Sequence, residues 1–313
     1  MAEKIATREA YGNALAELGE QYDFVVLDAD LAAATKTGVF KKKFPERFFD
    51  CGIAEGNMMS VAAGLAAAGK VPFVSSFAMF AAGRAYEQVR NTVGYPHLNV
   101  KIGATHAGIT VGEDGATHQC NEDIALMRTI PGMTIINPAD AVEAKAAVKA
   151  ALLTDGPVYM RFGRYAVPVI NDAATYEFEL GRGVLMNEGS DVTFVATGIM
   201  VDMALTAAAR LKEEGISARV INIHTIKPLD REIVIAAARE TGAIVTAEEH
   251  NVIGGLGAAV AEAVSESYPV PVLRVGVEDQ YGRSGTVPAL LEMYGLTPDN
   301  LVAKAKAAIA LKK

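Results

Sequence analysis

Short runs rich in Val, Ile and Phe alternate along this chain with longer Ala-rich segments that have the 3.6-residue period of a helix. In the first half, the runs lie at residues 24–28, 71–77, 100–105, 134–137 and 158–161, and the helical segments at 8–21, 55–68, 84–93, 121–129 and 139–153. A second series has runs at 192–196, 218–223, 243–247 and 272–275, and ends in an amphipathic helix at 298–311. This alternation predicts βαβ units, and therefore mostly parallel sheets covered by helices on both faces.

The two series are separated by a stretch with a looser pattern. Between residues 165 and 183 the chain carries Pro168, Asn171 and Gly181 around a short polar segment, which is typical of a linker. A chain of 313 residues is long enough for two domains. We therefore predict an α/β fold of two three-layer domains, the first over residues 1–170, a linker over 171–184, and a smaller second domain over 185–313.

Charge and composition exclude several classes of protein. The formal net charge of −8 argues against a general nucleic-acid binder, although an acidic protein can still hold a local basic pocket for a small anion. No apolar run reaches the roughly 18 residues of a membrane span, and residues 1–8 lack the apolar stretch of a signal peptide. Cys51 and Cys120 form neither a disulfide framework nor a zinc spacing. We expect a soluble cytoplasmic protein with reduced thiols and no membrane contact.

A carboxylate stands where a predicted strand runs into a helix. Glu55 follows the short run at 48–52 and opens an apolar helix, with the small residues Ala54 and Gly56 on either side. Ligands bind at the carboxyl ends of strands in open α/β sheets, and small neighbours allow a close approach. Glu55 is therefore either a helix N-terminal carboxylate stabilised by the helix dipole or a buried acid that faces a ligand.

A polar, glycine-bearing loop follows the strand predicted at 100–105. Residues 112–119 read Gly-Glu-Asp-Gly-Ala-Thr-His-Gln, and the wider loop contains His106, Asp114 and His118. A loop can present such groups while a rigid sheet positions them. These three side chains suit a metal, but we favour hydrogen bonds to the hydroxyl groups of a sugar and predict no metal held by this chain.

Aromatic and basic residues lie near the same strand ends. Phe77 and Phe80 either pack in the core or form a wall against a flat heteroaromatic ring. The arginines at positions 8, 128, 161 and 164 either form surface ion pairs or clamp a phosphate group. Their spacing does not choose between these alternatives.

Taken together, these segments resemble the C-terminal half of transketolase, in the form that is encoded as a separate small subunit. The pattern Gly-x-Asp-Gly-x-Thr-His-Gln is specific to transketolases and deoxyxylulose-phosphate synthases. The resemblance implies a thiamine-diphosphate pyrimidine-binding domain followed by a transketolase C-terminal domain. It covers essentially the whole chain and includes Ala6-Thr-Arg8, Asp28-Ala-Asp-Leu31, Gly52-Ile-Ala-Glu-Gly-Asn57, the Phe77/Phe80 segment, Gly112–Gln119, Asn137-Pro-Ala-Asp140 and Ile226-Lys-Pro-Leu-Asp230.

The resemblance also implies a cofactor site. Thiamine diphosphate would be the cofactor, and Glu55 matches the glutamate that bonds to N1′ of its pyrimidine ring. Phe77 and Phe80 match the aromatic patch over that ring. We therefore expect Glu55 to be catalytic as well as cofactor-binding.

Substrate residues follow from the same resemblance. Asp114 and His118 match residues that contact sugar hydroxyls near the reacting carbons, where they would orient the substrate and shuttle protons. Arg8, His106 and Arg161 match positions that hold the sugar phosphate. The expected reaction moves a two-carbon ketol unit from a ketose phosphate to an aldose phosphate.

Transketolases hold the diphosphate through Mg²⁺ with a Gly-Asp-Gly and a downstream Asn. This chain has no such motif, because Gly112–Gly115 belongs to the substrate loop. We therefore expect a partner, an N-terminal transketolase subunit that carries the diphosphate-binding domain and binds most of the Mg²⁺. The expected assembly is an α2β2 heterotetramer that shares thiamine diphosphate between the two kinds of subunit and is inactive without the partner.

Departures from the family pattern leave alternatives open. Ala107 stands where many transketolases carry Asp, and Cys120-Asn121 replaces the usual Pro-Ile, so the acceptor sugar is not fixed. Half of a deoxyxylulose-phosphate synthase and the β subunit of a 2-oxoacid dehydrogenase share parts of the pattern. A catalytically silent regulatory or scaffold subunit is the alternative from a different class.

Overall fold

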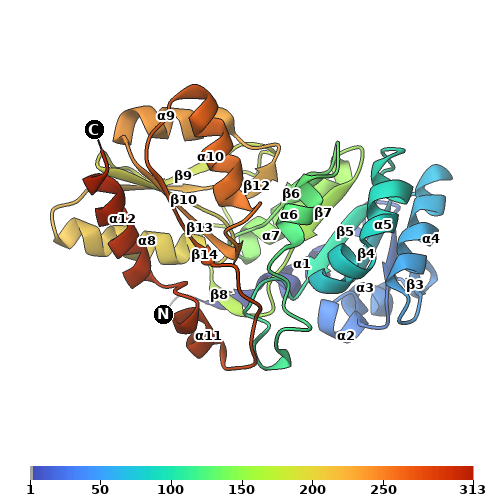
Figure 1. Ribbon diagram of the computed structural model, residues 1–313. Coiled ribbons are helices and arrows are strands. Elements are labelled where there is room, and N and C mark those ends of the chain that lie inside the picture. Colours follow the sequence, from blue (N-terminus) through green and yellow to red (C-terminus); the bar gives the residue numbers. More distant parts are fainter. Residues whose placement is uncertain (1–2, 313) are drawn as a thin grey trace.

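The computed structural model describes residues 3–312 and contains two α/β units built on separate sheets (Figure 1). The outermost limits of the predicted domains, residues 1 and 313, lie outside the described residues. Both sheets are mostly parallel, and each is covered by helices on both faces. The predicted fold class is therefore confirmed.

The first unit contains a seven-stranded sheet in the order β12-β6-β7-β5-β4-β2-β3. Every neighbouring pair is parallel except β12 with β6. The parallel order explains why the strands are continuous apolar runs, since both faces are buried. The strands are β2 (Val25–Asp28), β3 (Phe48–Asp50), β4 (Pro72–Phe77), β5 (Lys101–Thr105), β6 (Thr134–Ile136), β7 (Val158–Arg161) and β12 (Thr225–Lys227).

Two apolar clusters sandwich this sheet. Adjacent residues of one strand enter different clusters, as Val26 and Leu27 do, because successive side chains point to opposite faces. One face is covered by α1 (Thr7–Leu18), α3 (Gly38–Lys43) and α7 (Ala141–Leu153). The other is covered by α4 (Glu55–Ala67), α6 (Asp123–Arg128) and a helical stretch at 79–94. The short helix α2 (Ala32–Thr35) follows β2.

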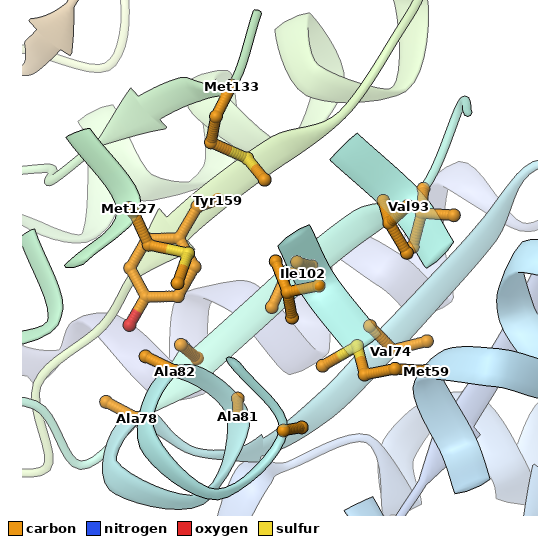
Figure 2. Packing of buried hydrophobic residues seen from close by; sticks show 14 of the residues in the cluster. Met59, Val74, Ala78, Ala81, Ala82, Val93, Ile102, Met127, Met133 and Tyr159 are labelled. Atoms are coloured by element: carbon orange, nitrogen blue, oxygen red, sulfur yellow. The ribbon is translucent and has the colours of Figure 1, made fainter. Parts of the chain in front are cut away.

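That helical stretch differs from the helix predicted at residues 84–93. It begins directly after β4 and runs as a π-helix η2 (Met79–Arg84), a turn of α-helix α5 (Tyr86–Gln88) and a second π-helix η3 (Val89–Gly94). Figure 2 shows Ala78, which precedes this stretch, and Ala81 and Ala82 within it facing the core beside the buried strands. Their small side chains let the stretch pack closely on the sheet. π-Helical turns often occur at functional sites.

The second unit has five strands in the order β14-β13-β10-β11-β9, parallel except for β9. Helices α8 (Met200–Glu213) and α12 (Pro298–Ala310) cover one face, and α9 (Arg231–Thr241) and α10 (Leu256–Ser267) cover the other. The helix α11 (Val287–Met293) lies near the end of the chain. The strands are β9 (Val184–Asn187), β10 (Val192–Ala196), β11 (Ala218–Asn222), β13 (Ile244–Asn251) and β14 (Val272–Val277).

Three short strands, β12, β8 and β1, form pairings that periodicity did not predict, and one of them joins the two units. β12 comes from the second half of the chain but pairs with β6 of the first sheet, where Thr225 faces Ile136. β8 (Ala166–Pro168) returns to pair with β1 (Lys4–Ala6) near the start of the chain. β9 starts at the last residue of the predicted linker. The strands β1 (Lys-Ile-Ala) and β12 (Thr-Ile-Lys) each have only three residues and mix polar with apolar side chains, which is too little pattern to be recognised from sequence.

No helix within residues 3–312 is both long and apolar enough to cross a membrane. Cys51 and Cys120 are free thiols, and Cys120 is buried.

Candidate active site

A cleft of about 530 Å³ opens where several loops meet at the carboxyl ends of the first sheet. Its walls come from the loops after β2 and β3, the start of α4, the π-helix η2 and the glycine-bearing loop after β5. This is where ligands bind in parallel α/β sheets. The lining residues are Ala29, Asp30, Leu31, Ile53, Glu55, Phe80, Arg84, Thr117 and His118.

Glu55 is the buried acid of this cleft. It is the first residue of α4, and only 2% of it is exposed. Its two carboxylate oxygens lie 3.2 and 3.1 Å from Nη1 of Arg84, whose side chain is 56% exposed. The positive end of the helix dipole also favours an anion at this position. Glu55 is therefore both a carboxylate at a helix N-terminus and a buried acid at a cleft, and its contact with a ligand stays a prediction.

Phe77 and Phe80 form an aromatic wall beside Glu55. Phe77 ends β4 and Phe80 lies in η2, and their rings are stacked with centroids 5.7 Å apart and planes 14° apart. The ring of His118 meets both edge-on, 6.1 Å from Phe77 and 5.5 Å from Phe80. Phe80 lines the cleft, whereas Phe77 is 6% exposed and lies behind it.

The glycine-bearing loop presents His118 but leaves Asp114 at its surface. His118 is half-buried and lines the cleft, with Thr117 Oγ1 2.9 Å from its Nδ1. Asp114 ends the short 3-10 turn Gly112–Asp114 and is exposed. It is not among the residues that line the cleft. Its predicted role therefore depends on a substrate that extends beyond the cleft.

Gln119 fixes this loop in place, and sequence reasoning gave it no role. Its side-chain amide donates to the carbonyls of Ile109, Gly112 and Arg283, at 3.0, 3.4 and 2.8 Å. Arg283 belongs to the second unit, so the C-terminal part of the chain holds the loop that carries His118. A side chain added at Gly115 would lie 2.4 Å from Ser284 Oγ, and φ there is +76°, so both the turn and the contact require glycine.

The loop after β2 contributes Asp30, a second residue that received no role from sequence. Asp30 lines the cleft with φ of +61°, a region that non-glycine residues rarely occupy and that is enriched at functional sites. Buried Asp28 fixes the loop by accepting hydrogen bonds from Leu31 N, Thr35 and Thr37, at 2.6, 2.7 and 2.8 Å. Burial raises the pKa of Asp28 to about 6.

A basic cluster lies next to the aromatic wall. Arg8, in the first turn of α1, places Nη1 2.9 Å from His106 Nε2 and 3.0 Å from the carbonyl of Ala34. Burial and then the charge of Arg164 lower the pKa of Arg8. Within residues 3–312, its buried Nε has no hydrogen-bond partner. An unpaired donor on a partly buried cation suits an anionic ligand.

His106 is neutral in this setting. Burial, followed by the charges of Arg8 and Arg164, lowers its pKa to about 3. Because the Arg8 guanidinium can only donate, Nε2 of His106 must accept, and we assign the ring proton to Nδ1, which lies 2.9 Å from Thr105 Oγ1. His106 also adopts φ of +57°. Such strain is characteristic of residues held in place at functional sites.

The prediction that Arg161 holds a phosphate is wrong in this structure. Arg161 is 3% exposed, and its Nε is 2.9 Å from Asp123 Oδ2. Its Nη2 donates to the carbonyls of Cys120 and Glu249, at 3.2 and 2.8 Å. The guanidinium is thus committed to a buried ion pair with Asp123 of the same unit and to a hydrogen bond with Glu249 of the second unit.

Arg164, three residues further on, replaces Arg161 in the basic cluster. Its side chain is 37% exposed, donates to the carbonyl of Val111 and lies 3.4 Å from Glu113 Oε2. Its charge acts on both Arg8 and His106. The sequence contained both arginines, but only the end of β7 at Arg161 shows which of them is buried.

In residues 3–312 the structure brings no three His, Cys, Asp or Glu side chains into an arrangement that could hold a metal ion. In particular, Nδ1 of His118 is engaged with Thr117, and His106 is engaged with Arg8 and Thr105. The site therefore combines a buried acid, an aromatic wall, a half-buried histidine and a basic cluster.

Comparison with known proteins assigns both units. The family model of the transketolase pyrimidine binding domain matches residues 3–169, and that of the transketolase C-terminal domain matches residues 181–301. A putative transketolase C-terminal section from Methanocaldococcus jannaschii is 50% identical over 299 residues, which cover 94% of this chain and 93% of the relative. A 6-deoxy-6-sulfo-D-fructose transketolase subunit from Clostridium sp. (strain MSTE9) is 48% identical over 94% of this chain and 92% of its own length.

Two further comparisons show how much of each protein the similarity covers. Mouse transketolase is 40% identical over 98% of this chain, which spans 49% of that protein. A solved split-gene transketolase, an inactive β4 tetramer, is 56% identical, with a TM-score of 0.91 over 99% of this chain and 100% of that one.

Proposed function

Because this chain belongs to the transketolase family, as the C-terminal section of a split transketolase, we propose that it is the small subunit of a two-subunit enzyme. The enzyme transfers a two-carbon ketol unit from a ketose phosphate to an aldose phosphate. Membership rests on the two matching family models and on relatives that align along nearly their whole length. The observation that carries the proposed activity is the buried carboxylate of Glu55 at the wall of the cleft.

We propose that the cleft holds the pyrimidine ring of thiamine diphosphate. Glu55 would hold the ring nitrogen N1′, and Phe80, backed by Phe77, would hold the ring face. A carboxylate with 2% exposure needs a polar partner, and Arg84 is that partner in this structure. When bound, the cofactor would supply the nucleophilic carbon and the electron sink of the reaction.

His118 and Asp114 would handle the sugar near the reacting carbons. The Thr117 hydroxyl orients the His118 ring, so its other nitrogen remains available to exchange a proton with a sugar hydroxyl. His118 lies in the same cleft as Glu55. The exposed carboxylate of Asp114 would meet the hydroxyls of a sugar that enters from outside.

Arg8, His106 and Arg164 would bind the terminal anion of the sugar. The unpaired Nε of Arg8 and the half-buried Arg164 provide positive charge, and neutral His106 holds Arg8 in place. The relatives from Clostridium sp. and from Phocaeicola vulgatus carry the names of a sulfosugar and an apulose phosphate transketolase subunit. Both names point to sugars with an anionic group, which agrees with a basic cluster here.

We also propose a partner subunit that carries the diphosphate-binding domain and most of the Mg²⁺ site, in an α2β2 assembly. The supporting observation is the lack of a Gly-Asp-Gly with a downstream Asn in this sequence. The solved β4 tetramer of a split-gene relative is described as inactive, which agrees with the same division of labour in that protein.

The test is reconstitution of this chain with an N-terminal transketolase subunit. We expect sugar transfer from xylulose 5-phosphate to ribose 5-phosphate only when both chains, thiamine diphosphate and Mg²⁺ are present. Pyruvate with glyceraldehyde 3-phosphate should give no product. Product from that second pair would instead identify a deoxyxylulose-phosphate synthase, and transfer by the single chain would refute the need for a partner.

A further inference from the structure

The side chain of Arg84 makes two contacts in the cleft, one with Glu55 and one with Phe80. Its Nη1 lies 3.2 and 3.1 Å from the two oxygens of Glu55, and its Cζ lies 4.8 Å from the centroid of the Phe80 ring. Arg84 and Phe80 are four residues apart in η2, so their side chains lie on one side of the helical stretch. The planar guanidinium therefore bridges the buried acid and the aromatic wall.

These are the two contacts that the pyrimidine ring requires under the proposed function, on which this inference rests. The ring needs a carboxylate oxygen for its nitrogen and an aromatic face for its plane. A guanidinium offers the same combination, a flat delocalised group with N–H donors at its edge. We propose that Arg84 is a positioning residue. While no cofactor is bound, its guanidinium occupies the position of the pyrimidine ring, and it must leave Glu55 when the cofactor binds.

The surroundings of Arg84 allow it to leave. Its side chain is 56% exposed, whereas Glu55 is 2% exposed, so movement of the arginine costs little desolvation and movement of the acid would cost much. No other cation is in hydrogen-bond or ion-pair contact with Glu55 within residues 3–312. Arg84 thus keeps a buried acid paired until another partner replaces it.

Competition between Arg84 and the cofactor for Glu55 predicts the direction in which cofactor affinity changes when Arg84 is replaced. An arginine that merely completed the cofactor site would weaken cofactor binding when it is replaced. An arginine that competes with the cofactor would strengthen binding when its charge is removed. For a half-exposed ion pair, we expect Arg84→Gln to bind thiamine diphosphate about fivefold more tightly, which corresponds to about 1 kcal/mol.

The experiment is calorimetric titration of the reconstituted two-subunit complex with thiamine diphosphate at fixed Mg²⁺. Arg84→Lys keeps a cation near Glu55 and should bind the cofactor like the wild type. Arg90→Gln is the matched control, because Arg90 is exposed, lies in the same helical stretch and pairs with Asn91 instead of Glu55. The KM for the sugar donor should stay within about twofold in Arg90→Gln, since Arg90 is exposed and does not line the cleft.

The possible outcomes distinguish the inference about Arg84 from the proposed function. Tighter binding by Arg84→Gln alone supports the inference. Equal or weaker binding by a folded Arg84→Gln complex overturns it and leaves the proposed function standing. If the wild-type complex does not bind thiamine diphosphate, the proposed function fails and this inference fails with it.

Discussion

The imidazole of His106 lies flat against the ring of Phe77, with centroids 3.7 Å apart and planes 23° apart. The same imidazole accepts a hydrogen bond from Arg8. His106 therefore connects the basic cluster, which would bind the anionic end of the sugar, to the aromatic wall, which would bind the cofactor ring. The two halves of the candidate site are joined through a single side chain.

Replacement of His106 should consequently affect both halves. We expect His106→Asn to weaken cofactor binding about fivefold, because the stacking contact is lost, and also to raise the KM for phosphorylated sugars. His97→Asn is a matched control, since His97 has φ of +56° and His106 has +57°, and Asn tolerates this region well. Calorimetry and steady-state kinetics measure the two effects. A change in only one of them would show that the halves are independent.

Glu55→Gln should reduce kcat of the reconstituted complex by about 10²–10⁴-fold, the range of a lost general acid–base group. The substitution keeps the shape of the side chain but removes its ability to take up a proton. Glu87→Gln, an exposed change in the neighbouring helical stretch, serves as the control and should leave kcat unchanged. Full turnover by Glu55→Gln would favour a scaffold role for this chain.

Arg164→Gln should raise the KM for phosphorylated donors by about 10- to 100-fold, since a hydrogen bond to a charged group contributes about 1.5–3 kcal/mol. Donors without a phosphate should be unaffected. Arg210→Gln, on the exposed side of α8, is the control. An equal loss with both kinds of donor would remove Arg164 from the anion site.

Arg161→Met tests whether Arg161 stabilises the fold or binds a phosphate. Removal of this cation leaves the Asp123 carboxylate buried without its charge partner, so we expect the free energy of unfolding to fall by about 3–5 kcal/mol. Lys70→Met breaks an exposed pair with Asp23 and should cost about 1 kcal/mol or less. Denaturant unfolding measures both. A stable Arg161→Met protein with a selectively raised KM for phosphorylated sugars would restore the original assignment.

His250 should make the fold sensitive to acid. It is fully buried between the units, where Ala125 N donates to its Nε2 at 3.3 Å and its Nδ1 lies 2.7 Å from the carbonyl of Asn251. Burial lowers the pKa of His250 to about 4, although the nearby Asp123 carboxylate opposes this. Protonation in the unfolded chain begins near pH 6.5, so this contribution to stability is complete above pH 6.5 and is lost as the pH falls towards 4.

The His250 contribution amounts to about 3 kcal/mol between these pH values. We therefore expect His250→Gln to flatten the decline of unfolding free energy between pH 6.5 and 4, because Gln keeps a hydrogen-bond acceptor but does not titrate. Denaturant unfolding at a series of pH values measures the slope, and His97→Gln, an exposed histidine, is the reference. Identical slopes for His250→Gln and the wild type would contradict the assignment.

Most of the architecture could be predicted from the sequence because a buried parallel strand must be apolar throughout and a covering helix must be apolar on one side. The long elements, such as β4 and α7, satisfy both conditions and were found near their observed positions. The strand β12 was missed because its three residues show no clear apolar pattern and its partner β6 lies far away in sequence. The start of the helical stretch after Phe77 was also missed, since π-helical turns have no distinct apolar period.

The sequence by itself determined which chemical groups are present: an acid at the start of a helix, two phenylalanines, a loop with two histidines, and several arginines. Only the tertiary structure decided which of them meet. Arg161 and Arg164 are indistinguishable by composition and spacing, but the first ends a buried strand and pairs with Asp123, whereas the second lies past the end of that strand and is partly exposed. The physical reason is that burial depends on what packs against a residue, and for Arg161 those neighbours include Glu249, 88 positions away in the chain.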